Sequence, residues 1–493
     1  MRQLRLVRNR CPAYHGAVKR VAPGPVIVSF DMGTVVVELN GNELPEGETP
    51  LLTWDHRVCA LRGEAMAYRT ILEMLVRHKI PFEDRAKAYE TFPELAPVAP
   101  FTPYPHQQQA LEAWKKGGMR GVVVLPTGSG KTWLAHLALQ HCRRSALVVV
   151  PTLDLVSQWA SGIERVFGQA PGIIGGGDFE VRPLTVITYD SAIRHMETLG
   201  NRFGLIVFDE CHHLPSPNYA LAARLTLSPF RLGLTATPER SDGGEALLEE
   251  LVGPVVFSSR VSALAGDVLA PYKTVRVLVD LTPEEVEAYQ AARSIYLDFC
   301  GSKGVRMSDP DGYRRFLQET ARSHAGRAAF DAYLRQRNIP LQSEAKFAEL
   351  SSLLHRHKGD RIILFTHVNE MAYRIARRYL LPVITHQTPP KERAQILSRF
   401  GTGAYPAVVT SRVLNEGVDV PEANVGIVMS GTGSIREHVQ RLGRILRRRE
   451  GKEAVLYEVV ARDTHEEGMS RRRTRHEAYR NPNARKRYRP GTA

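Results

Sequence analysis

The sequence has no apolar run long enough to cross a membrane, and its arginine-rich first ten residues lack the apolar stretch of a signal peptide. Cysteine is also scarce, since the chain holds only 5, scattered and without a Cys-x-x-Cys pair. That spacing argues against a zinc or iron–sulfur site and fits a reducing cytosol. We therefore expect a cytoplasmic protein with no membrane partner.

Acidic residues are too few to balance the basic ones. Lys and Arg number 66 against 52 Asp and Glu, which gives a formal net charge of +14. Residues 468–493 hold nine basic side chains and one acidic side chain, so this tail carries +8 of that charge. The excess predicts a polyanionic partner, although a generally basic proteome would give the same balance.

Residues 121–132 have the pattern of a phosphate-binding loop. The apolar run at 122–125 predicts a buried strand, a glycine-rich turn follows, and Lys131 opens a helix. Backbone N–H groups and the helix dipole favour an anion here, Lys131 suits the β- and γ-phosphates of ATP, and the Thr132 hydroxyl suits Mg²⁺. Leu125 stands where the general pattern has its first glycine. The predicted ATP-binding residues of the loop are Thr127, Gly128, Ser129, Gly130, Lys131 and Thr132.

A further nucleotide contact is predicted upstream of the loop. Gln107 stands near the start of a predicted helix, just after Phe101 and Tyr104. A glutamine amide can read an adenine edge with its donor and its acceptor, and an aromatic ring can stack on the base. A solvated glutamine is the alternative, and the nearby phosphate loop favours the nucleotide contact.

Further apolar runs lie at 146–150, 184–188, 203–208 and 231–234, and each ends in polar residues. Because they alternate with helical stretches, they predict a parallel sheet with its functional groups at the carboxyl ends of the strands. Asp209 and Glu210 follow the third of these runs. We assign Asp209 to the metal and Glu210 to general-base catalysis, the alternative being two solvated carboxylates.

A second set of strand signals occupies the later part of the chain, at 362–365, 382–385, 407–410, 425–428 and 454–459. It contains no second phosphate loop, so this sheet completes a site without owning one. Residues 291–340 have helical periodicity and no strand signal. Near the start, the runs around 26–39 predict a hairpin and residues 64–79 predict a helix. Residues 93–105 are rich in proline and predict a linker.

Arginines in the second sheet domain complete the proposed site. Arg444 and Arg447 are one helical step apart and can face the same point, where their guanidinium groups suit the γ-phosphate. They reach the nucleotide only when the two lobes close, which would couple hydrolysis to lobe motion. A basic helix that faces DNA is the alternative. Gly417 and Asp419 follow another strand end, where Gly417 suits a turn and Asp419 suits a ribose or an arginine, although an ordinary loop would have the same residues.

The segments LPTGSGKT, VVPT, DECH, TAT and QRLGRILR occur in that order, and together they resemble the superfamily 2 helicases of the DExH type. The resemblance covers about residues 101–460. Gln440 stands where DEAD-box proteins carry histidine, as in the DExH type. The resemblance implies an α/β fold of two RecA-like parallel-sheet lobes with a small N-terminal α+β domain and a helical thumb-like insert. The expected domains are 1–90 (N-terminal), 91–265 (lobe 1, ATP-binding), 266–345 (connecting strand and insert), 346–462 (lobe 2) and 463–493 (basic tail).

A narrower resemblance points to the XPB-type repair helicases, which are related to the translocase subunit of transcription factor H. Residues 240–242 look like the RED motif of that branch, but they read Arg-Ser-Asp and lack its middle acid. The N-terminal region looks like the damage-recognition domain of the branch, and the insert stands where such proteins carry a thumb. The matching N-terminal residues are Trp54, Asp55, His56, Arg57, Arg62 and Tyr68.

The resemblance implies an ATP- and Mg²⁺-dependent DNA helicase or translocase that acts in DNA repair on duplex or forked DNA without sequence preference. Some microbial members pair with a structure-specific nuclease, and this chain has no nuclease carboxylate cluster of its own. Alternatives are an RNA helicase, a restriction-type translocase subunit or a non-hydrolysing DNA-binding scaffold. Residues implied to couple the lobes are His212, Thr235, Thr237 and Gln440. Residues implied to contact DNA are Pro151, Thr152, Thr188, Arg240, Asp242, Thr366 and Thr410.

Overall fold

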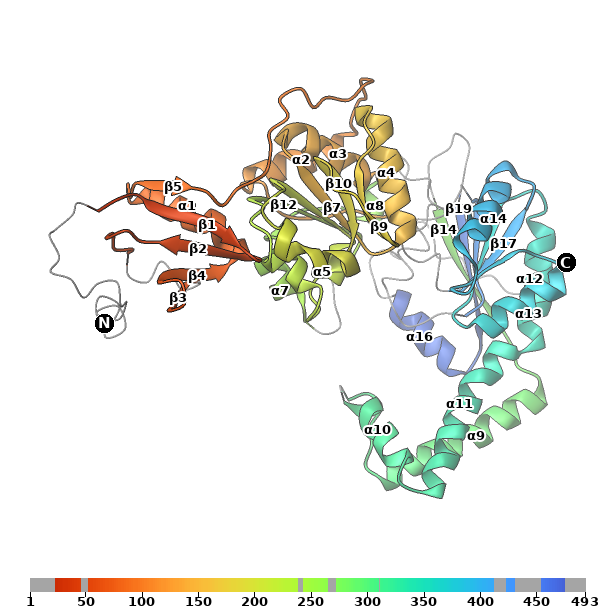
Figure 1. The fold of residues 1–493 in the computed structure, drawn as a ribbon. Helices are drawn as coiled ribbons and strands as arrows, with labels where there is room; N and C mark the ends of the chain where they lie inside the picture. Colours follow the sequence, from red (N-terminus) through yellow and green to blue (C-terminus); the bar gives the residue numbers. More distant parts are fainter. Residues whose placement is uncertain are drawn as a thin grey trace. The chain divides into compact units, whose positions relative to one another are not determined.

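The structure is a computed structural model that describes residues 23–45, 52–237, 243–264, 272–309, 311–411, 423–430 and 454–474 (Figure 1). The chain forms two compact units: residues 1–126 and 130–259 make up the first, and residues 127–129 and 260–493 make up the second. Across the described ranges, every helix is too short or too polar to span a bilayer.

The first unit begins with a five-stranded sheet in the order β3-β4-β2-β1-β5. The predicted hairpin is confirmed by the antiparallel pairing of β1 and β2, with Asp31 opposite Thr34. Met32 and Gly33 form its two-residue turn with φ of 44° and 78°, the left-handed geometry that such tight hairpins require. Helix α1 covers one face of the sheet within the predicted range 64–79. The bounds are β1 (Val26–Asp31), β2 (Thr34–Glu38), β3 (Leu52–Asp55), β4 (Ala60–Glu64), α1 (Tyr68–Arg77) and β5 (Phe82–Asp84).

The small N-terminal sheet packs directly on the larger domain that follows in the same unit. Leu227 of the larger domain lies in the N-terminal hydrophobic core. Arg69 donates to the carbonyl oxygens of Gly118 at 2.6 Å and Pro229 at 3.1 Å. A Cβ on Gly33 would lie 2.7 Å from Leu225 Cδ2, so the hairpin turn approaches this loop more closely than a side chain would allow. The two parts therefore share an apolar and hydrogen-bonded interface.

The larger domain is built on an eight-stranded sheet in the order β13-β6-β12-β11-β7-β10-β8-β9. All neighbouring strands are parallel except β8 and β9, which are antiparallel. The predicted strands are confirmed as β6, β7, β10, β11 and β12, whereas the short strands β8, β9 and β13 were not predicted. The bounds are β6 (Arg120–Val124), β7 (Ala146–Val150), β8 (Gly172–Gly175), β9 (Asp178–Phe179), β10 (Leu184–Thr188), β11 (Leu205–Asp209), β12 (Phe230–Thr235) and β13 (Val255–Ser258).

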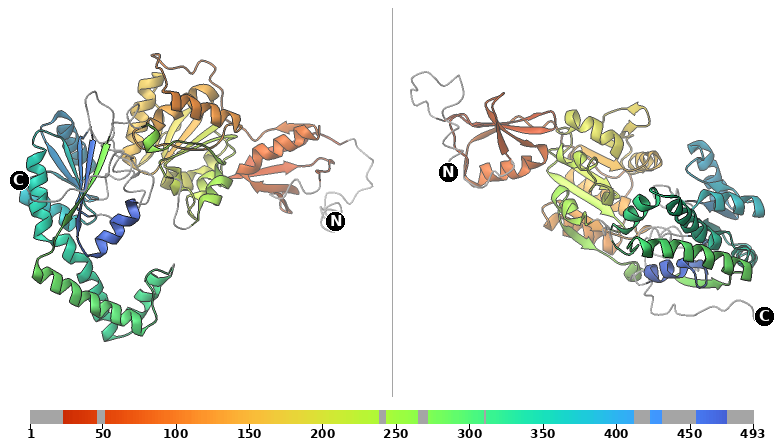
Figure 2. Two further views of the ribbon diagram at one scale, coloured as in Figure 1. Left: turned by 180° about the vertical axis from the view of Figure 1, so that it is seen from behind. Right: turned by 90° about the horizontal axis from the view of Figure 1, so that it is seen from below.

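Side chains alternate across this sheet and form a separate hydrophobic core on each face. Val123 and Leu125 join the core under α2, α3 and α4, whereas Val122 and Val124 join the core under α5, α6 and α7. The sheet is therefore covered on both faces, as apolar parallel strands require. The helices can be followed in Figure 2. Their bounds are α2 (Pro105–Lys116), α3 (Lys131–Cys142), α4 (Leu153–Phe167), α5 (Tyr189–Leu199), α6 (Ala220–Arg224) and α7 (Glu245–Leu251).

The proline-rich stretch at 93–105 leads from the N-terminal domain into α2, and it packs against the larger domain. Leu95 is buried in the core of the larger domain, and Val98 N–H donates to the carbonyl of Val166 at 2.8 Å. Apolar packing and a backbone hydrogen bond therefore fix the stretch along the domain surface, and residues 93–104 have no helix or strand.

The second unit contains a six-stranded, all-parallel sheet in the order β14-β19-β18-β15-β17-β16. Every strand predicted for this part of the chain is present. Hydrophobic cores lie on both of its faces. The bounds are β14 (Tyr272–Val279), α12 (Glu344–Arg356), β15 (Ile362–Phe365), α13 (Asn369–Tyr379), β16 (Val383–Ile384), α14 (Pro390–Thr402), β17 (Ala407–Thr410), β18 (Val425–Val428) and β19 (Ala454–Ala461).

The predicted helical insert consists of α9 (Pro283–Ser302), α10 (Gly312–Thr320) and α11 (His324–Gln342). The three helices pack around their own aromatic core, in which Phe316 is fully buried between Tyr296, Phe299 and Tyr333. The insert thus has a hydrophobic core separate from those of the sheet.

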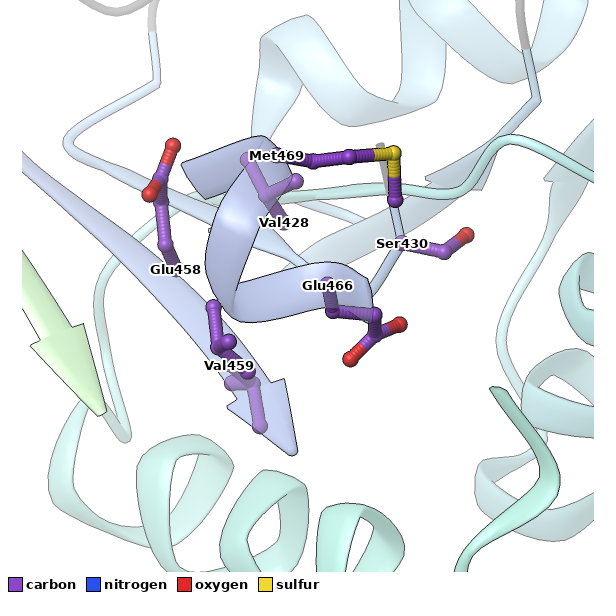
Figure 3. Close-up of a pocket in the computed structure, with 7 residues that line it drawn as sticks. Val428, Ser430, Glu458, Val459, Glu466 and Met469 are labelled. Carbon is purple, nitrogen blue, oxygen red and sulfur yellow. The ribbon is translucent and has the colours of Figure 1, made fainter. Parts of the chain in front are cut away.

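The first part of the basic tail is a helix, α16 (His465–Thr474), that packs on β19. Lys346 of α12 is fully buried and donates to Glu466 Oε1 at 2.7 Å and to the carbonyl of Met429 at 2.9 Å. Ser470 donates to the buried carboxylate of Glu458 at 2.8 Å. Glu458, Glu466 and Met469 line a small pocket beside this helix (Figure 3). Buried polar contacts therefore fix α16 to the second sheet.

Candidate functional site

The phosphate loop connects β6 to α3, as the sequence predicts. Gly128 and Gly130 both have φ of 85°, and Gly130 is the residue that precedes the first turn of α3. A Cβ on Gly130 would lie 2.2 Å from Gln107 Nε2. The left-handed backbone favours glycine at this position, and a side chain here would displace the Gln107 amide from the loop.

Gln107 lies beside the loop because the start of α2 holds it there. Its Oε1 accepts a hydrogen bond from Tyr104 N–H at 3.0 Å, and its Nε2 donates to the carbonyl of Gly130 at 3.2 Å. The side chain is buried, with 2% of its surface exposed. The predicted base-reading amide therefore contacts the phosphate loop directly. Phe101, which precedes α2, and Trp133, in the first turn of α3, form an aromatic pair with ring centroids 4.5 Å apart.

The side chains of Lys131 and Glu210 face one another at the edge of the sheet formed by the carboxyl ends of its strands. Lys131 Nζ lies 3.9 Å from Glu210 Oε1, and it donates to the carbonyl of Leu125 at 3.4 Å. Lys131 is the first residue of α3, whose free backbone N–H groups favour an anion. A cation at the loop therefore lies beside a carboxylate at the end of β11. Thr132 is the next residue of the same helical turn.

Asp209 is buried at the end of β11 and has a donor on each carboxylate oxygen. Trp159 Nε1 donates to Oδ2 at 2.8 Å, and Glu210 N–H donates to Oδ1 at 3.0 Å. Burial and the adjacent charge of Glu210 raise the pKa of Asp209 from 3.8 to about 6, while Lys131 and the Trp159 hydrogen bond act in the opposite direction. A bound cation would favour the charged form further.

Glu210 has a backbone conformation that non-glycine residues rarely adopt. Its φ and ψ are 46° and 50°, in the left-handed region. Its Oε2 makes no hydrogen bond within the described residues and lies 3.4 Å from His212 Nδ1. Strain of this kind is common at functional sites because it directs a side chain that an extended strand would place elsewhere.

His212 connects the end of β11 to the end of β12. Its Nδ1 lies 3.0 Å from Thr235 Oγ1, and Thr235 Oγ1 in turn donates to the carbonyl of Thr237 at 3.0 Å. His212 and Thr235 are both fully buried. The residues that the sequence assigns to coupling in this lobe thus form one hydrogen-bonded chain that starts next to Glu210. Gln440, the fourth residue of that set, lies outside the described residues.

The threonines assigned to DNA contact have identifiable structural roles. Thr152 follows Pro151 at the end of β7 and caps α4, accepting from Leu155 N–H at 3.3 Å, while Thr188 caps α5 and accepts from Ser191 N–H at 3.1 Å. Strands β7 and β10 are neighbours, so both caps lie at the same edge of the sheet. A surface that contacts the DNA backbone needs its contact residues on one edge, as these two caps are. The contacts with DNA stay a prediction.

In the second unit, Thr366 directly follows β15, and Thr410 is the last residue of the neighbouring strand β17. Both side chains are fully buried, and the Thr366 hydroxyl donates to the carbonyl oxygens of Val368 and Thr410, each at 3.2 Å. Their hydroxyls are therefore used within the unit, and contact with DNA at this edge stays a prediction. The remaining site residues lie outside the described part of the chain: Arg240, Asp242, Gly417, Asp419, Gln440, Arg444 and Arg447.

Two residues near Asp209 were not identified from the sequence. Trp159 reaches it from α4, and the Tyr189 hydroxyl donates to its backbone carbonyl at 3.1 Å. Both side chains lie in apolar helical stripes, where an aromatic residue normally indicates only core packing. Nothing in a single sequence distinguishes these two from the other buried aromatic residues.

Comparison with known proteins identifies the family to which the chain belongs. Residues 28–86 match the family model described as the xeroderma pigmentosum group B helicase damage recognition domain, and residues 334–478 match the ERCC3/RAD25/XPB C-terminal helicase model. Residues 100–240 match the model described as the res subunit of type III restriction enzymes. The DNA 3'-5' translocase XPB2 of Sulfurisphaera tokodaii is 41% identical over 430 residues, which cover 87% of this chain and 97% of that protein. The chain belongs to the XPB family.

Similarity within the XPB family extends to eukaryotes. The general transcription and DNA repair factor IIH helicase/translocase subunit XPB of Drosophila melanogaster is 27% identical over 498 residues. The match covers 93% of this chain but only 57% of the fly protein. Among solved structures, the Hef helicase domain of Pyrococcus furiosus has a TM-score of 0.49 at 18% identity, covering 74% of this chain and 97% of that domain. The two XPB family models and the 41% identity to the Sulfurisphaera tokodaii translocase confirm the sequence-based assignment to the XPB branch of the superfamily 2 helicases.

Proposed function

We propose that this XPB-family protein is an ATP-dependent DNA helicase or translocase that acts in DNA repair. The observation that carries the proposal is the gathering of Lys131, Asp209 and Glu210 at the head of one sheet, with His212 joining them to Thr235. A scaffold that only binds DNA has no chemical need for this arrangement. Relatives named as DNA 3'-5' translocase and helicase support the same activity.

Each group has a proposed role that follows from its chemistry. Lys131 and the N–H groups at the start of α3 would hold the β- and γ-phosphates of ATP, with Thr127, Gly128, Ser129 and Gly130 forming the loop around them. Glu210 would orient and deprotonate the attacking water. Gln107 would read the adenine edge while contacting the loop that binds the phosphates.

The residues near the loop fit a magnesium ion. Asp209 offers a carboxylate and Thr132 a hydroxyl, both hard oxygen donors, and Mg²⁺ in nucleotide sites takes few protein ligands and keeps water and phosphate oxygens. When bound, the ion would supply positive charge that neutralises the phosphate oxygens. Asp209 would hold the water shell of the ion, and Thr132 would place its hydroxyl from the first turn of α3.

The second unit would complete the site. Arg444 and Arg447 would stabilise the charge that develops on the transferred phosphoryl group, an effect on the order of 10³–10⁵ in rate for arginines of this type. Gly417 and Asp419 would sense the nucleotide, and Gln440 would couple it to DNA together with His212, Thr235 and Thr237. Opening and closing of the lobes during the ATP cycle would then drive movement along DNA.

DNA would be held through its backbone, without sequence preference, by the strand-end threonines of both units and by Arg240 and Asp242. The damage-recognition-like N-terminal domain would contribute duplex or forked DNA contacts. A structure-specific nuclease is a proposed partner, because some microbial proteins that the sequence resembles pair with one.

Deletion of residues 475–493 should weaken DNA binding mainly at low salt. The segment contains six basic residues and one acidic residue, and its deletion removes none of the residues that the structure describes. Each lost phosphate contact should reduce the slope of log K against log salt by roughly 0.9 for duplex DNA. Fluorescence anisotropy of a labelled duplex measured across a salt series checks this result. An unchanged slope would rule out residues 475–493 as a DNA contact.

ATPase stimulation by different nucleic acids tests the proposed function. We expect single-stranded, duplex or forked DNA to increase turnover, and RNA of matched length and sequence to increase it much less. An RNA helicase would reverse that order. Restriction-type translocation would require duplex DNA and would gain nothing from a fork, so the forked and blunt duplexes separate the remaining alternatives.

A further inference from the structure

Trp159 contacts Asp209 at the end of β11, which its position in the chain does not suggest. It lies 50 residues before Asp209, yet its indole N–H donates to Asp209 Oδ2 at 2.8 Å. Trp159 is 1% exposed and Asp209 is 6% exposed, so water cannot replace either partner easily. With Glu210 N–H on Oδ1, the two donors fix the rotation of the carboxylate about its side-chain bonds.

An indole N–H suits this task because it is a donor only. It is satisfied when an acceptor oxygen of Asp209 faces it, and it becomes an unpaired buried donor if the carboxylate turns away. Each carboxylate oxygen still has a further lone pair beyond the one used. Trp159 can therefore hold the carboxylate in one orientation without blocking the oxygens that the proposed Mg²⁺ shell would use.

The indole is itself held between two elements of the site. His136 of α3 meets it edge to face, with ring centroids 5.8 Å apart and an interplanar angle of 80°. His136 lies one turn after Thr132 on the phosphate-loop helix, and within the described residues neither of its ring nitrogens makes a hydrogen bond. Burial lowers the pKa of His136 to about 4, so the ring is neutral and packs as an apolar group. Trp159 thus contacts both α3, the helix that follows the phosphate loop, and the carboxylate of Asp209 at the end of β11.

The helix that carries Trp159 begins at the predicted DNA edge. Thr152 caps α4, and Trp159 lies seven residues later, two turns along the helix. A rigid helix transmits a displacement of its first turn to a side chain two turns away. Any movement of the cap would therefore move the donor that holds Asp209.

We propose that Trp159 is a positioning residue: its indole N–H orients the Asp209 carboxylate for Mg²⁺ and ties that carboxylate to α4, the helix that begins at the predicted DNA contact Thr152. The inference rests on the proposed function, because it assumes that Asp209 holds the ion. It assigns no chemical step to Trp159. It predicts that losing the N–H harms metal-dependent nucleotide binding more than it harms the fold.

The chain offers a matched control. Trp114 is also 1% exposed in the same hydrophobic core, and its Nε1 donates to a buried acceptor, the carbonyl of Arg231, at 2.9 Å. Trp114→Phe and Trp159→Phe each remove one buried indole hydrogen bond from one domain. The two variants should lose similar amounts of stability. A difference between them in Mg²⁺-dependent nucleotide affinity therefore reports on the contact with Asp209.

The decisive measurement is the affinity of the full chain for a non-hydrolysable ATP analogue, with Mg²⁺ and with EDTA, in the presence and absence of duplex DNA. Trp159→Phe should reduce the Mg²⁺-dependent gain in affinity by about tenfold or more, the scale seen when a partner that orients a metal ligand is removed. Its affinity in EDTA should match that of the wild type, and any effect of DNA on analogue affinity should shrink. Trp114→Phe should change each quantity less than twofold.

A second readout uses the wild-type chain. It contains only 4 tryptophans, so its indole N–H groups give four signals in a ¹⁵N–¹H NMR spectrum, which Phe variants at 54, 114 and 133 assign by elimination. Adding Mg²⁺ to the analogue complex should shift the Trp159 signal and leave the Trp114 signal in place. A stationary Trp159 signal, or a Trp159→Phe variant that behaves as Trp114→Phe, would overturn the inference. A wild-type chain whose analogue affinity ignores Mg²⁺ would instead overturn the proposed function.

Discussion

Lys131→Ala and Glu210→Gln should each abolish DNA-stimulated ATP turnover while DNA binding persists. Lys131 supplies the cation at the phosphate loop, and removing one preorganised electrostatic contact of this kind costs about 10²–10³ in turnover. Glu210→Gln keeps the size of the side chain and removes its basicity, which is worth roughly 10²–10⁴. Phosphate release in the presence of saturating duplex DNA measures turnover, and anisotropy of the same duplex measures binding.

Lys115→Ala is the control for the loss of a positive charge. Lys115 lies on α2 in the same lobe and pairs with Glu112 at 2.8 Å on the surface, so its removal should leave turnover and binding near wild-type values. Wild-type turnover in both Lys131→Ala and Glu210→Gln would refute the assignment of the site. Persistent DNA binding with no turnover in the wild type would favour the scaffold.

The elements of the site could be predicted because the signals that define them are local. Buried parallel strands are continuous apolar runs, so β6, β7, β10, β11 and β12 could be located to within about two residues. The loop glycines and Lys131 follow directly in the sequence. Once the strands are parallel, their carboxyl ends meet at one edge, which is why Asp209, His212 and Thr235 could be expected together.

The features that the sequence did not reveal depend on contacts between distant residues. The Trp159–Asp209 hydrogen bond joins positions 50 residues apart, and the Lys346–Glu466 pair joins positions 120 residues apart. In the sequence alone, each of these four residues looks ordinary: the tryptophan looks like a core aromatic residue, and the charged residues look like surface residues. The left-handed backbone of Glu210 is likewise set by its surroundings, because nothing in its residue type favours that conformation.

Lys346→Met should destabilise the second unit by about 3–5 kcal/mol, because it leaves the carboxylate of Glu466 buried without its counter-charge. Lys346 is fully buried and its ammonium joins three segments: its own helix α12, the carbonyl of Met429 after β18, and Glu466 of α16. The second oxygen of Glu466 accepts from Ala461 N–H at the end of β19, at 3.0 Å. Methionine keeps the length of the side chain and removes the charge with all three donors.

The positions of the tryptophans allow the effect to be assigned to one unit. All 4 lie before residue 160, in the first unit, so fluorescence during urea unfolding follows that unit while far-UV circular dichroism follows both. Lys346→Met should lower the circular-dichroism midpoint that belongs to the second unit and leave the fluorescence midpoint unchanged. Lys358→Met, which removes an exposed cation from the same unit, is the control.

A double variant separates the loss of a charge pair from the burial of a single charge. Lys346→Met with Glu466→Leu removes both charges and fills the space with apolar atoms, so it should recover part of the stability that Lys346→Met alone loses. The polar connection from α12 to Met429 would still be missing, and the carbonyl of Met429 would remain buried without its donor. Recovery therefore should be incomplete. A double variant less stable than the sum of its single variants would show that the ion pair is not what holds α16 against the sheet.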